Sequence, residues 1–573
     1  MCKQRFLVTA ALPYANGRLH VGHIAGAYLP ADTYVRYLRA CGHDVRFICG
    51  SDDNGVASLI SARQEDRTVE DLTAQYNARQ AADFAGMGIE FDIYGGTHQP
   101  EYVELHNQFS QRFFKTLYDK GFFRKTRTQQ LFDEQAQQFL PDRYVQGKCH
   151  HCGFDEAFGD QCEHCGQAID PTMLINPVST ITGTTPKLRD TTHWFLQLNR
   201  FEGELKQWLE SKRDATSDCP AWRSAVINFS LGQIKQGLPE RAMTRDLNWG
   251  VPVPLEDPDA AGKVLYVWFD APIGYVSFTA RLCEQQGGDC QEYERWWKSP
   301  DCKIIHFIGE DNTVFHALIW PAMLMAEGSY QLPSQVVANA FLNIKLPGVE
   351  EQKISKSRGT AIWVEEFLKL FDPDPLRYYL TAIAPETQRA TFDLDDFIAR
   401  NNNELLAALG NFVNRSMTFA HRYFNGQVPA ADNLDERDHA QLAAIADHVR
   451  AVTANLDQFR FRLALADIMS LAREANGYFE DKAPWQQRKG NLEACGTTIN
   501  VCLQTVRALA TLMAPILPAS AQKCAEMLGL GSNVLPWHDA AAPLSVDQPL
   551  GEPVILFKKL DAVEVFEPTA NAT

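Results

Sequence analysis

The chain has 573 residues, which is too many for one hydrophobic core, so we expect three to five domains or large insertions. The composition is that of an ordinary folded protein, and the net charge of −17 argues against indiscriminate nucleic-acid binding but allows RNA recognition through a local basic face. The N-terminal apolar run is too short for a secretory signal, and Pro515 and Pro518 break the most apolar later stretch, so we expect a cytoplasmic protein that crosses no membrane.

The first motif is FLVTAALPYANGRLHVGH, residues 6–23. Residues 6–10 predict a buried parallel strand, a turn follows, and helical spacing begins after Gly22. Such a helix start attracts anions, and two imidazoles, His20 and His23, lie there. Gly22 has no side chain, so a flat ring such as adenine could lie against the backbone. From this motif alone, an equally good interpretation is a pair of helix-start histidines that cap each other.

Residues 44–49 (DVRFIC) predict a second strand that leads into Asp52. A carboxylate at the carboxyl end of a parallel strand faces the crevice where α/β sheets bind ligands, so Asp52 could hold an ammonium group. Taken alone, it is better explained as a turn residue that caps the next helix. Helical patterns over 69–87 and 101–120 complete an alternation that predicts a doubly wound, Rossmann-like parallel sheet.

Four cysteines, Cys149, Cys152, Cys162 and Cys165, form two C-x2-C pairs nine residues apart. Paired knuckles of this kind converge four thiolates on a zinc ion. The alternatives are disulfides, which a cytosolic location disfavours, or chance clustering. With all four positions filled by cysteine, the metal would be structural.

Residues 200–212 and 221–236 predict amphipathic helices, and 264–270 (VLYVWFD) and 303–308 (KIIHFI) predict strands. Trp268, Tyr275, Phe315 and His316 would then meet at strand ends as an aromatic small-molecule pocket. Each of them taken singly is more often a core residue.

Residues 335–344 predict a further strand, and KISKSRG (353–359) follows it. A polar loop with Lys353 and Lys356 three apart can close over a triphosphate, although such a loop is more often merely solvated. From Leu394 to about Leu528 the pattern is almost entirely helical, and the last residues read as an extended tail that packs back on the body.

The expected domains follow these changes of pattern. They are a first half of the sheet domain at 1–118, an insertion with the zinc knuckle at 119–245, a second half of the sheet domain at 246–332, a region with the KISKS loop at 333–392, an all-α bundle at 393–535 and a C-terminal tail at 536–573.

HVGH after an N-terminal strand, followed by KISKS about 330 residues later, resembles the paired motifs of class I aminoacyl-tRNA synthetases. Together with PYANGRLHVGH, the cysteine knuckles and YVWFDAPIGY, these motifs resemble the methionyl-tRNA synthetase family, in the same order over residues 6–485.

The resemblance implies roles residue by residue. His20, Gly22, His23, Lys353 and Lys356 would bind ATP, with the two histidines and two lysines acting in catalysis. Methionine would be bound by Leu12, Tyr14, Asp52, Trp268, Ala271, Pro272, Tyr275 and His316, with Asp52 on the α-ammonium. Zinc would be held by Cys149, Cys152, Cys162 and Cys165, and the anticodon would be read by Asn411, Arg415 and Trp485.

Four positions depart from the family pattern: Asp53 and Asn54, where the family usually has Glu and His, Glu310 and Ile354. Ile354 replaces Met with little change in volume. Glu310 reverses a charge near the triphosphate, so we expect it to point away or to pair with a cation.

The resemblance implies a methionine–tRNA ligase that forms methionyl-adenylate and then charges tRNA(Met), which carries a CAU anticodon. Magnesium would enter with ATP. A C-terminal dimerisation domain does not fit after about Leu550, so we expect a monomer. Two rivals remain: a paralogue that activates an amino acid for a non-tRNA acceptor, and a zinc-bearing RNA-binding module without catalysis. The helical region with its anticodon positions weighs against the first, and the intact histidines and lysines weigh against the second.

Overall fold

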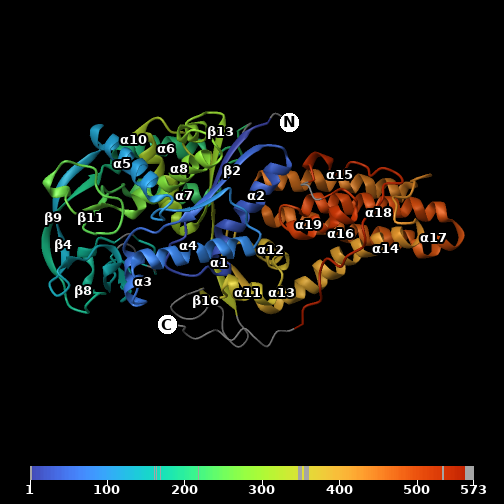
Figure 1. Cartoon of the computed structure of the whole chain (residues 1–573), viewed down its shortest axis with the longest axis horizontal. Coiled ribbons are helices and arrows are strands. Elements are labelled where there is room, and N and C mark those ends of the chain that lie inside the picture. Colours follow the sequence, from blue (N-terminus) through green and yellow to red (C-terminus); the bar gives the residue numbers. More distant parts are fainter. Residues whose placement is uncertain are drawn as a thin grey trace.

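A five-stranded, fully parallel sheet forms the centre of the larger body in Figure 1. The computed structural model describes residues 3–159, 162, 164–167, 169–216, 219–345, 352–353, 361–531 and 535–561. The strand order is β14-β13-β1-β2-β3. The strands are β1 (Arg5–Ala10), β2 (Asp44–Ser51), β3 (Ile93–Gly96), β13 (Cys302–Gly309) and β14 (Gln335–Asn339). The order reverses between β1 and β13, which is where sheets of this kind bind ligands.

Helices cover both faces of this sheet, which confirms the predicted doubly wound α/β fold. They are α1 (Val21–His23), α2 (Leu29–Ala40), α3 (Val56–Gln64), α4 (Val69–Gly86), α5 (Val103–Asp119), α8 (Val267–Gln285), α9 (Glu294–Trp297) and α10 (Trp320–Glu327). Side chains alternate along β1, so that Phe6 and Val8 enter one core and Leu7 enters the other. β1 is therefore mostly apolar, with only Arg5 and Thr9 polar, because it is buried on both faces.

The predicted strand over 264–270 is wrong for most of its length. Only Val264–Leu265 is extended, as β12, which pairs with β11 (Thr244–Arg245), and α8 begins at Val267. A short apolar run that is buried on all sides has the same hydrophobic pattern in a strand and in a helix. A proline usually ends a helix or strand, but Pro272 lies inside α8. The aromatic residues of this stretch are therefore carried by a helix and not by a strand end.

The single strand predicted over 335–344 is divided in the structure. β14 ends at Asn339, and Leu342–Lys345 forms β15 in a different sheet. There β15 pairs in parallel with β17 (Ala390–Asp393) and antiparallel with β16 (Gln352–Lys353). The chain thus leaves the central sheet here and begins a small connecting unit, which also contains α11 (Val364–Leu370) and α12 (Pro373–Ala382).

The insertion between α5 and β11 contains two sheets and two helices. One sheet has the order β10-β9-β4-β5, and the other, beside the cysteines, has the order β7-β6-β8. The elements are β4 (Phe123–Asp133), β5 (Gln138–Phe139), β6 (Val145–Lys148), β7 (Ala157–Phe158), β8 (Ile175–Ser179), β9 (Lys187–Leu196), β10 (Arg241–Ala242), α6 (Glu202–Ser211) and α7 (Ser224–Gln236). The two predicted amphipathic helices correspond to α6 and α7.

A helical bundle extends from the sheet domain to the far end of the molecule (Figure 1). Its helices are α13 (Leu394–Arg400), α14 (Asn411–Tyr423), α15 (Glu436–Asp457), α16 (Phe461–Lys482), α17 (Pro484–Gly490), α18 (Leu492–Met513) and α19 (Pro518–Met527). A π-helical segment, Asn401–Gly410, joins α13 to α14. None of the helices in the described part of the chain has both the length and the apolar character needed to span a bilayer.

Arg377 of α12 holds the bundle against the sheet domain. Its guanidinium is fully buried and lies 2.6 Å from Asp32 of α2, and it also donates to the carbonyls of Met87 and Ile516. These contacts come from three parts of the chain that are far apart in sequence. Breaking such a buried ion pair by removing one partner costs about 3–5 kcal/mol, so this junction is expected to be rigid.

Candidate functional site

His20 and His23 lie at the point where the order of the sheet reverses. His20 caps the N-terminus of α1, which continues through the π-helical segment Ile24–Tyr28 into α2. The two rings are stacked with centroids 3.7 Å apart, and the backbone N–H of His20 donates to Nδ1 of His23 over 3.1 Å. The mutual capping considered from the sequence is therefore present. It also fixes the two imidazoles side by side at one end of a helix that starts beside β1.

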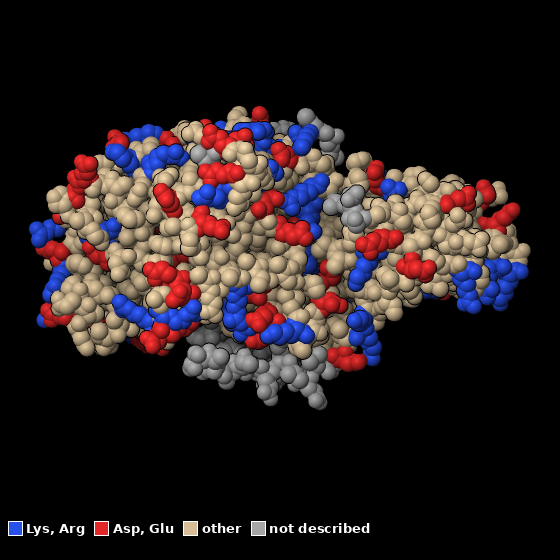
Figure 2. Space-filling model, in the orientation of Figure 1, with Lys and Arg blue, Asp and Glu red and all other residues tan. Residues whose placement is uncertain are grey.

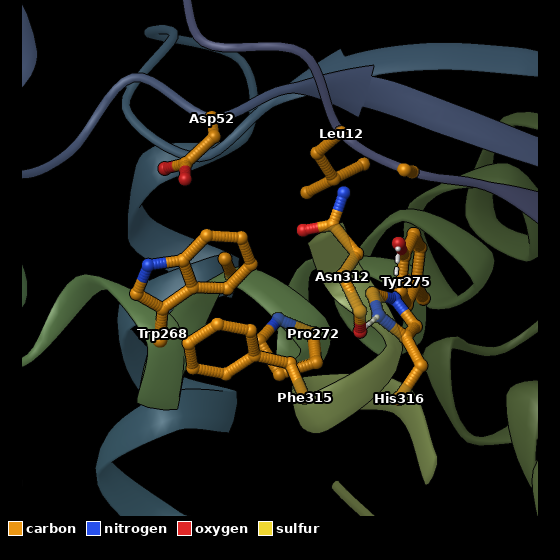
Figure 3. A pocket seen from close by; sticks show the side chains of 10 residues that line it. Leu12, Asp52, Trp268, Pro272, Tyr275, Asn312, Phe315 and His316 are labelled. Carbon is orange, nitrogen blue, oxygen red and sulfur yellow. Dashed lines mark hydrogen bonds between the residues drawn. The ribbon is translucent and has the colours of Figure 1, made fainter. Parts of the chain in front are cut away.

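A pocket opens next to β1, between the ends of β2 and β13, and measures about 350 Å³ (Figure 3). Its lining is mostly apolar and aromatic, with a few polar groups. The lining residues are Ala11, Leu12, Asp52, Trp268, Ala271, Pro272, Tyr275, Asn312, Phe315 and His316.

Seven of the eight residues expected to bind methionine line this pocket, and Tyr14 does not. Tyr14 lines an adjoining hollow of about 320 Å³, which also has Trp268 in its lining. Its ring meets the Trp268 ring edge-on, with centroids 6.2 Å apart. Trp268 therefore forms the wall between the two hollows.

Trp268 and Phe315 form the flat aromatic side of the pocket (Figure 3). Their rings are stacked at 3.9 Å with an interplanar angle of 9°. Trp268 comes from the first turn of α8, and Phe315 begins the π-helical segment Phe315–Ile319 after β13. Both elements pack on the same face of the sheet, which brings together two residues that lie 47 positions apart.

Asp52 is the charged group of the pocket. Its side chain is 2% exposed, and Oδ1 has no hydrogen-bond partner among the described residues. Burial raises the pKa of this carboxyl well above 3.8, and the charges of Asp270 and Asp53 raise it further. An unpartnered buried carboxyl oxygen is costly, and a cationic ligand would compensate for that cost.

A buried polar network begins two residues beyond Asp52, at Asn54. Asn54 donates from Nδ2 to Asp270 over 2.8 Å, and its Oδ1 lies 2.9 Å from Nδ1 of His98. His106 also contacts Asp270, with Nε2 3.2 Å from Oδ2. Burial raises the pKa of Asp270, and the contact with His106 partly offsets this effect. The departure at Asn54 is thus accommodated, because its amide bridges a carboxylate and an imidazole.

Tyr275 and His316 meet at the inner end of the pocket, where Figure 3 shows their hydrogen bond. Nδ1 of His316 lies 3.2 Å from the backbone carbonyl of Asn312 and must donate to it, and Nε2 lies 3.0 Å from the Tyr275 hydroxyl. Burial lowers the pKa of His316 to about 4, so the ring is neutral near pH 7. The proton on Nδ1 therefore leaves Nε2 to accept from Tyr275.

The sequence argument missed Ala11, Asn312 and His306. Asn312 lines the pocket just after the end of β13, and that position was itself the available signal, because ligands bind beyond the carboxyl ends of such strands. His306 lies within β13, where Nδ1 is 2.6 Å from the Thr9 hydroxyl and the ring is 5.5 Å from both Tyr275 and His316. No sequence pattern distinguishes it from an ordinary core residue.

The KISKS segment, expected to bind ATP, is described only in part. The backbone of Lys353 belongs to β16, whereas Lys356 lies outside the described residues. Ile354 lies outside them as well. Glu310 pairs with Arg389, Oε1 to Nε 3.9 Å, which confirms the expectation that it would meet a cation.

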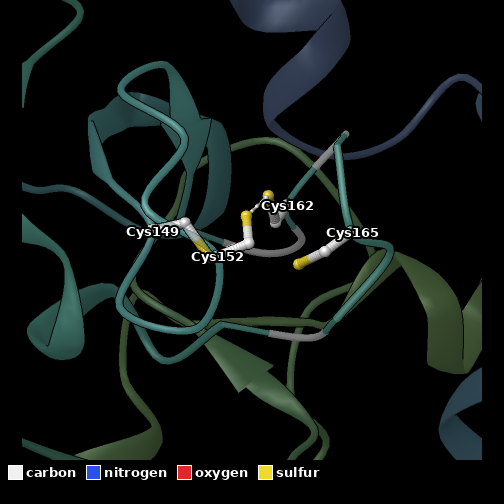
Figure 4. Close-up of side chains that lie close together, drawn as sticks. All are labelled: Cys149, Cys152, Cys162 and Cys165. Carbon is white, nitrogen blue, oxygen red and sulfur yellow. Dashed lines mark hydrogen bonds between the residues drawn. The ribbon is translucent and has the colours of Figure 1, made fainter.

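The four cysteine sulfurs converge from two loops of the insertion (Figure 4). All four atoms lie within 4.8 Å of one another, and those of Cys152 and Cys162 are 3.6 Å apart. Four thiolates around one zinc at about 2.3 Å would lie roughly 3.8 Å apart, so the donor set fits that ion. His164 stacks on Phe154 and is not among the converging groups.

The three expected anticodon residues lie at the far end of the bundle. Asn411 and Arg415 are one turn apart on α14, and Trp485 is in the first turn of α17. Arg415 pairs with Glu480 at 2.6 Å and lies 5.6 Å from the centroid of the Trp485 ring. Trp485 is half-buried and Asn411 is exposed, so this face presents one amide, one guanidinium and one indole.

Lysine and arginine side chains gather at this same end of the molecule (Figure 2). Arg422 lies in the last turn of α14, and Arg488 and Lys489 lie in the last turn of α17. All three are exposed. The guanidiniums of Arg422 and Arg488 lie 5.7 and 4.8 Å from the Tyr423 ring. The acidic protein thus carries a local basic face, as RNA recognition would require.

Comparison with known families gives two matches that together cover most of the chain. The family described as tRNA synthetases class I (M) matches residues 6–417, and the anticodon binding domain of methionyl tRNA ligase matches residues 428–568.

Curated relatives match nearly the whole chain. A methionine–tRNA ligase of Salinibacter ruber is 44% identical over an alignment 586 positions long, and the alignment covers 97% of this chain and 79% of the relative. One from Bacteroides fragilis strain YCH46 is 45% identical over 563 residues, with the same coverage. Among solved structures, Mycobacterium tuberculosis methionyl-tRNA synthetase bound by methionyl-adenylate has a TM-score of 0.79 at 24% identity, and the match covers 97% of this chain and 100% of that one. This structural likeness concerns the fold.

Proposed function

Because the chain belongs to the class I tRNA synthetase family of the methionyl type, we propose that it is a methionine–tRNA ligase. It activates methionine with ATP to give methionyl-adenylate and pyrophosphate, and it then transfers the methionyl group to the 3′ end of tRNA(Met). We place this activity in the cytoplasm.

The observation that carries the proposal is the buried Asp52 carboxyl in a pocket with mostly apolar and aromatic walls. Oδ1 of Asp52 has no hydrogen-bond partner among the described residues, and Asp52 lines the aromatic pocket (Figure 3). The α-ammonium of an amino acid supplies the missing charge and hydrogen bond. The remaining walls are apolar, so the side chain of the substrate is selected by shape and by contact with aromatic faces.

A thioether suits this pocket because it is long, unbranched and only weakly polar. Trp268 and Phe315 offer ring faces, and Leu12 and Pro272 offer aliphatic contacts. The Tyr275 hydroxyl is already used by His316, so the inner end of the pocket directs no strong donor at a sulfur atom. A hydroxyl or a charge at this end would lose hydration without a matched partner.

Adenylation would take place at the stacked histidines. The methionine carboxylate attacks the α-phosphorus of ATP in line, and pyrophosphate leaves. His20 and His23, with Lys353 and Lys356, would stabilise the charge that develops on the phosphates, and Gly22 would admit the adenine. Removing one such donor typically costs about 10²–10³ in rate. Magnesium would be carried by the nucleotide.

Zinc would be held by Cys149, Cys152, Cys162 and Cys165 and would serve folding and not chemistry. The four positions are all filled by protein thiols, which leaves no place for a substrate. Cys149 and Cys162 belong to a small separate core that also includes Val56 of α3, close to Asp52 in sequence, and Cys165 packs against it. A metal here would therefore fix the insertion next to the pocket.

In the domain division proposed from the sequence, residues 393–535 read the anticodon. Trp485 would stack on an unpaired base, and Asn411 and Arg415 would hydrogen-bond base edges. The basic face formed by Arg422, Arg488 and Lys489 would meet the flanking phosphates.

The test is ATP–pyrophosphate exchange with each amino acid, followed by charging of tRNA transcripts. We expect exchange with methionine without tRNA, and charging of a transcript with a CAU anticodon but not of one with the anticodon altered. Asp52→Asn, which keeps the shape and removes the charge, should weaken methionine-dependent exchange. Exchange with another amino acid, or exchange without charging of any tRNA, would reject the proposal.

A further inference from the structure

The strand-to-helix turn that carries His20 is paired with a distant segment of the chain. The backbone N–H of Val21 donates to the carbonyl of Ile362 over 3.0 Å, and that of Val364 donates to the carbonyl of Leu19 over 3.1 Å. These two bonds lie on either side of His20 and place Trp363 opposite it. The rings of His20 and Trp363 have centroids 6.2 Å apart at 52°.

Arg18 secures this pairing from the side. Its guanidinium lies 4.9 Å from the centroid of the Trp363 ring. Nη1 is 2.6 Å from Oε1 of Glu366, and Nη2 is 3.6 Å from Oε2 of Glu365. One planar cation therefore covers the indole and binds two carboxylates, a geometry that lysine cannot reproduce.

Glu365, the more distant of the two carboxylates from Arg18, has two further cationic partners. Arg79 and Lys369 both pair with Glu365, and these contacts lower the pKa of Glu365 to about 2. Asp83 of α4 accepts a hydrogen bond from the Leu19 backbone. Side-chain exposure is 21% for Arg18 and 31% for Glu366, so their pair is partly shielded from solvent.

We propose that Arg18 is a positioning residue for adenylation: by binding Trp363 and Glu366, it holds the indole against His20 and so fixes the stacked imidazoles. The inference rests on the proposed function. Arg18 reaches the reaction only through Trp363 and His20. A displacement of about 1 Å at a reacting group can lower the reaction rate about 10²-fold. Loss of the Arg18 contacts would therefore lower turnover without removing a substrate contact.

The experiment measures methionine-dependent ATP–pyrophosphate exchange in the full chain. We expect Arg18→Gln to lower kcat about tenfold, with KM for methionine and for ATP changed less than about twofold. Glu366→Gln should have the same effect. The double variant Arg18→Gln/Glu366→Gln should be no slower than either single variant, because each single variant already breaks the Arg18–Glu366 ion pair. The charge-swapped pair Arg18→Glu/Glu366→Arg should recover part of the loss.

Lys369→Gln is the matched control, because Lys369 pairs with Glu365 but contacts neither Trp363 nor Glu366 in the described structure. It should leave kcat unchanged. Amide hydrogen exchange at residues 19–23 should be faster in Arg18→Gln than in Lys369→Gln, with melting temperatures equal within about 2 °C.

Three results would overturn the inference: a rise in KM for ATP alone, which would make Arg18 a direct nucleotide contact; losses that add in the double variant; or an unchanged kcat in Arg18→Gln. Absence of methionine-dependent exchange in the unaltered chain would instead reject the proposed function, and this inference with it.

Discussion

Arg415 and Glu480 form an ion pair at the far end of the bundle, with Nη1 of the guanidinium 2.6 Å from Oε1 of the carboxylate. The same guanidinium lies 4.2 Å from the centroid of Phe479 and 5.6 Å from that of Trp485. Arg415 is thus held between an acid and two aromatic rings. Since a guanidinium has five N–H donors, the ion pair with Glu480 leaves further N–H groups that could reach a base edge.

Replacing Trp485 should impair tRNA recognition alone. We expect Trp485→Ala to lower kcat/KM for tRNA charging about 5- to 150-fold, since one base–aromatic stack contributes about 1–3 kcal/mol. Trp485→Phe should retain more activity, because it keeps a ring. Charging kinetics with a CAU transcript measure the effect, and exchange without tRNA is the control. Equal loss in both assays would make Trp485 a folding residue.

Methionine activation should weaken in acid because Asp52 must be ionised to hold an ammonium group. The pKa of free Asp52 is raised above 3.8 by burial, so kcat/KM for methionine should rise with pH through that raised pKa and then level off. Bound ammonium stabilises the carboxylate, so the acid limb of kcat should lie at lower pH. Exchange kinetics from pH 4.5 to 8 measure both limbs.

Asp52→Asn provides the comparison for this pH profile. It should lower the plateau of kcat/KM about 10- to 150-fold, because a hydrogen bond to a charged group contributes about 1.5–3 kcal/mol. It should also abolish the limb that belongs to this carboxyl. A variant that kept the same acid limb would assign the titration to another group.

Truncating Phe315 should weaken methionine binding more than it slows the chemistry. Phe315 supports the Trp268 ring at 3.9 Å, and an aromatic pair of this kind contributes about 0.5–1.5 kcal/mol beyond its buried area. We therefore expect Phe315→Ala to raise KM for methionine roughly 2- to 12-fold in exchange assays, with a smaller change in kcat. Phe315→Leu should lie between, and an unchanged KM in Phe315→Ala would contradict the role.

The cysteine cluster should hold one zinc per chain and stabilise the insertion. We expect Cys162→Ser to lose zinc on metal analysis and to melt at a lower temperature, because a four-thiolate site contributes folding free energy directly. His151→Ala is the control, since His151 is outside the converging group, and it should keep its zinc. Full zinc and unchanged melting in Cys162→Ser would refute this assignment.

Local patterns in the sequence predicted much of the fold. The apolar runs at β1, β2 and β13 and the helical spacing of α4 and α5 appear in the structure almost as predicted. The C-x2-C pairs likewise predicted their own convergence, because each pair folds a tight turn by itself. These features depend on periodicity or on contacts within a few residues, and the order of residues alone specifies both.

Tertiary packing decided what periodicity could not. Residues 264–270 have no polar alternation that would mark one exposed face. Only burial of α8 between β2, β3 and α5 decided that the stretch is helical from Val267 onward. Because β13 lies beside β1, Asn312 lines the pocket and the His306 ring lies 5.5 Å from the rings of Tyr275 and His316. Arg18 and Glu366 are 348 residues apart, and Arg415 and Glu480 are 65 apart. Charged residues can pair with many partners, so only the folded backbone, which brings certain pairs within hydrogen-bond distance, selects among them.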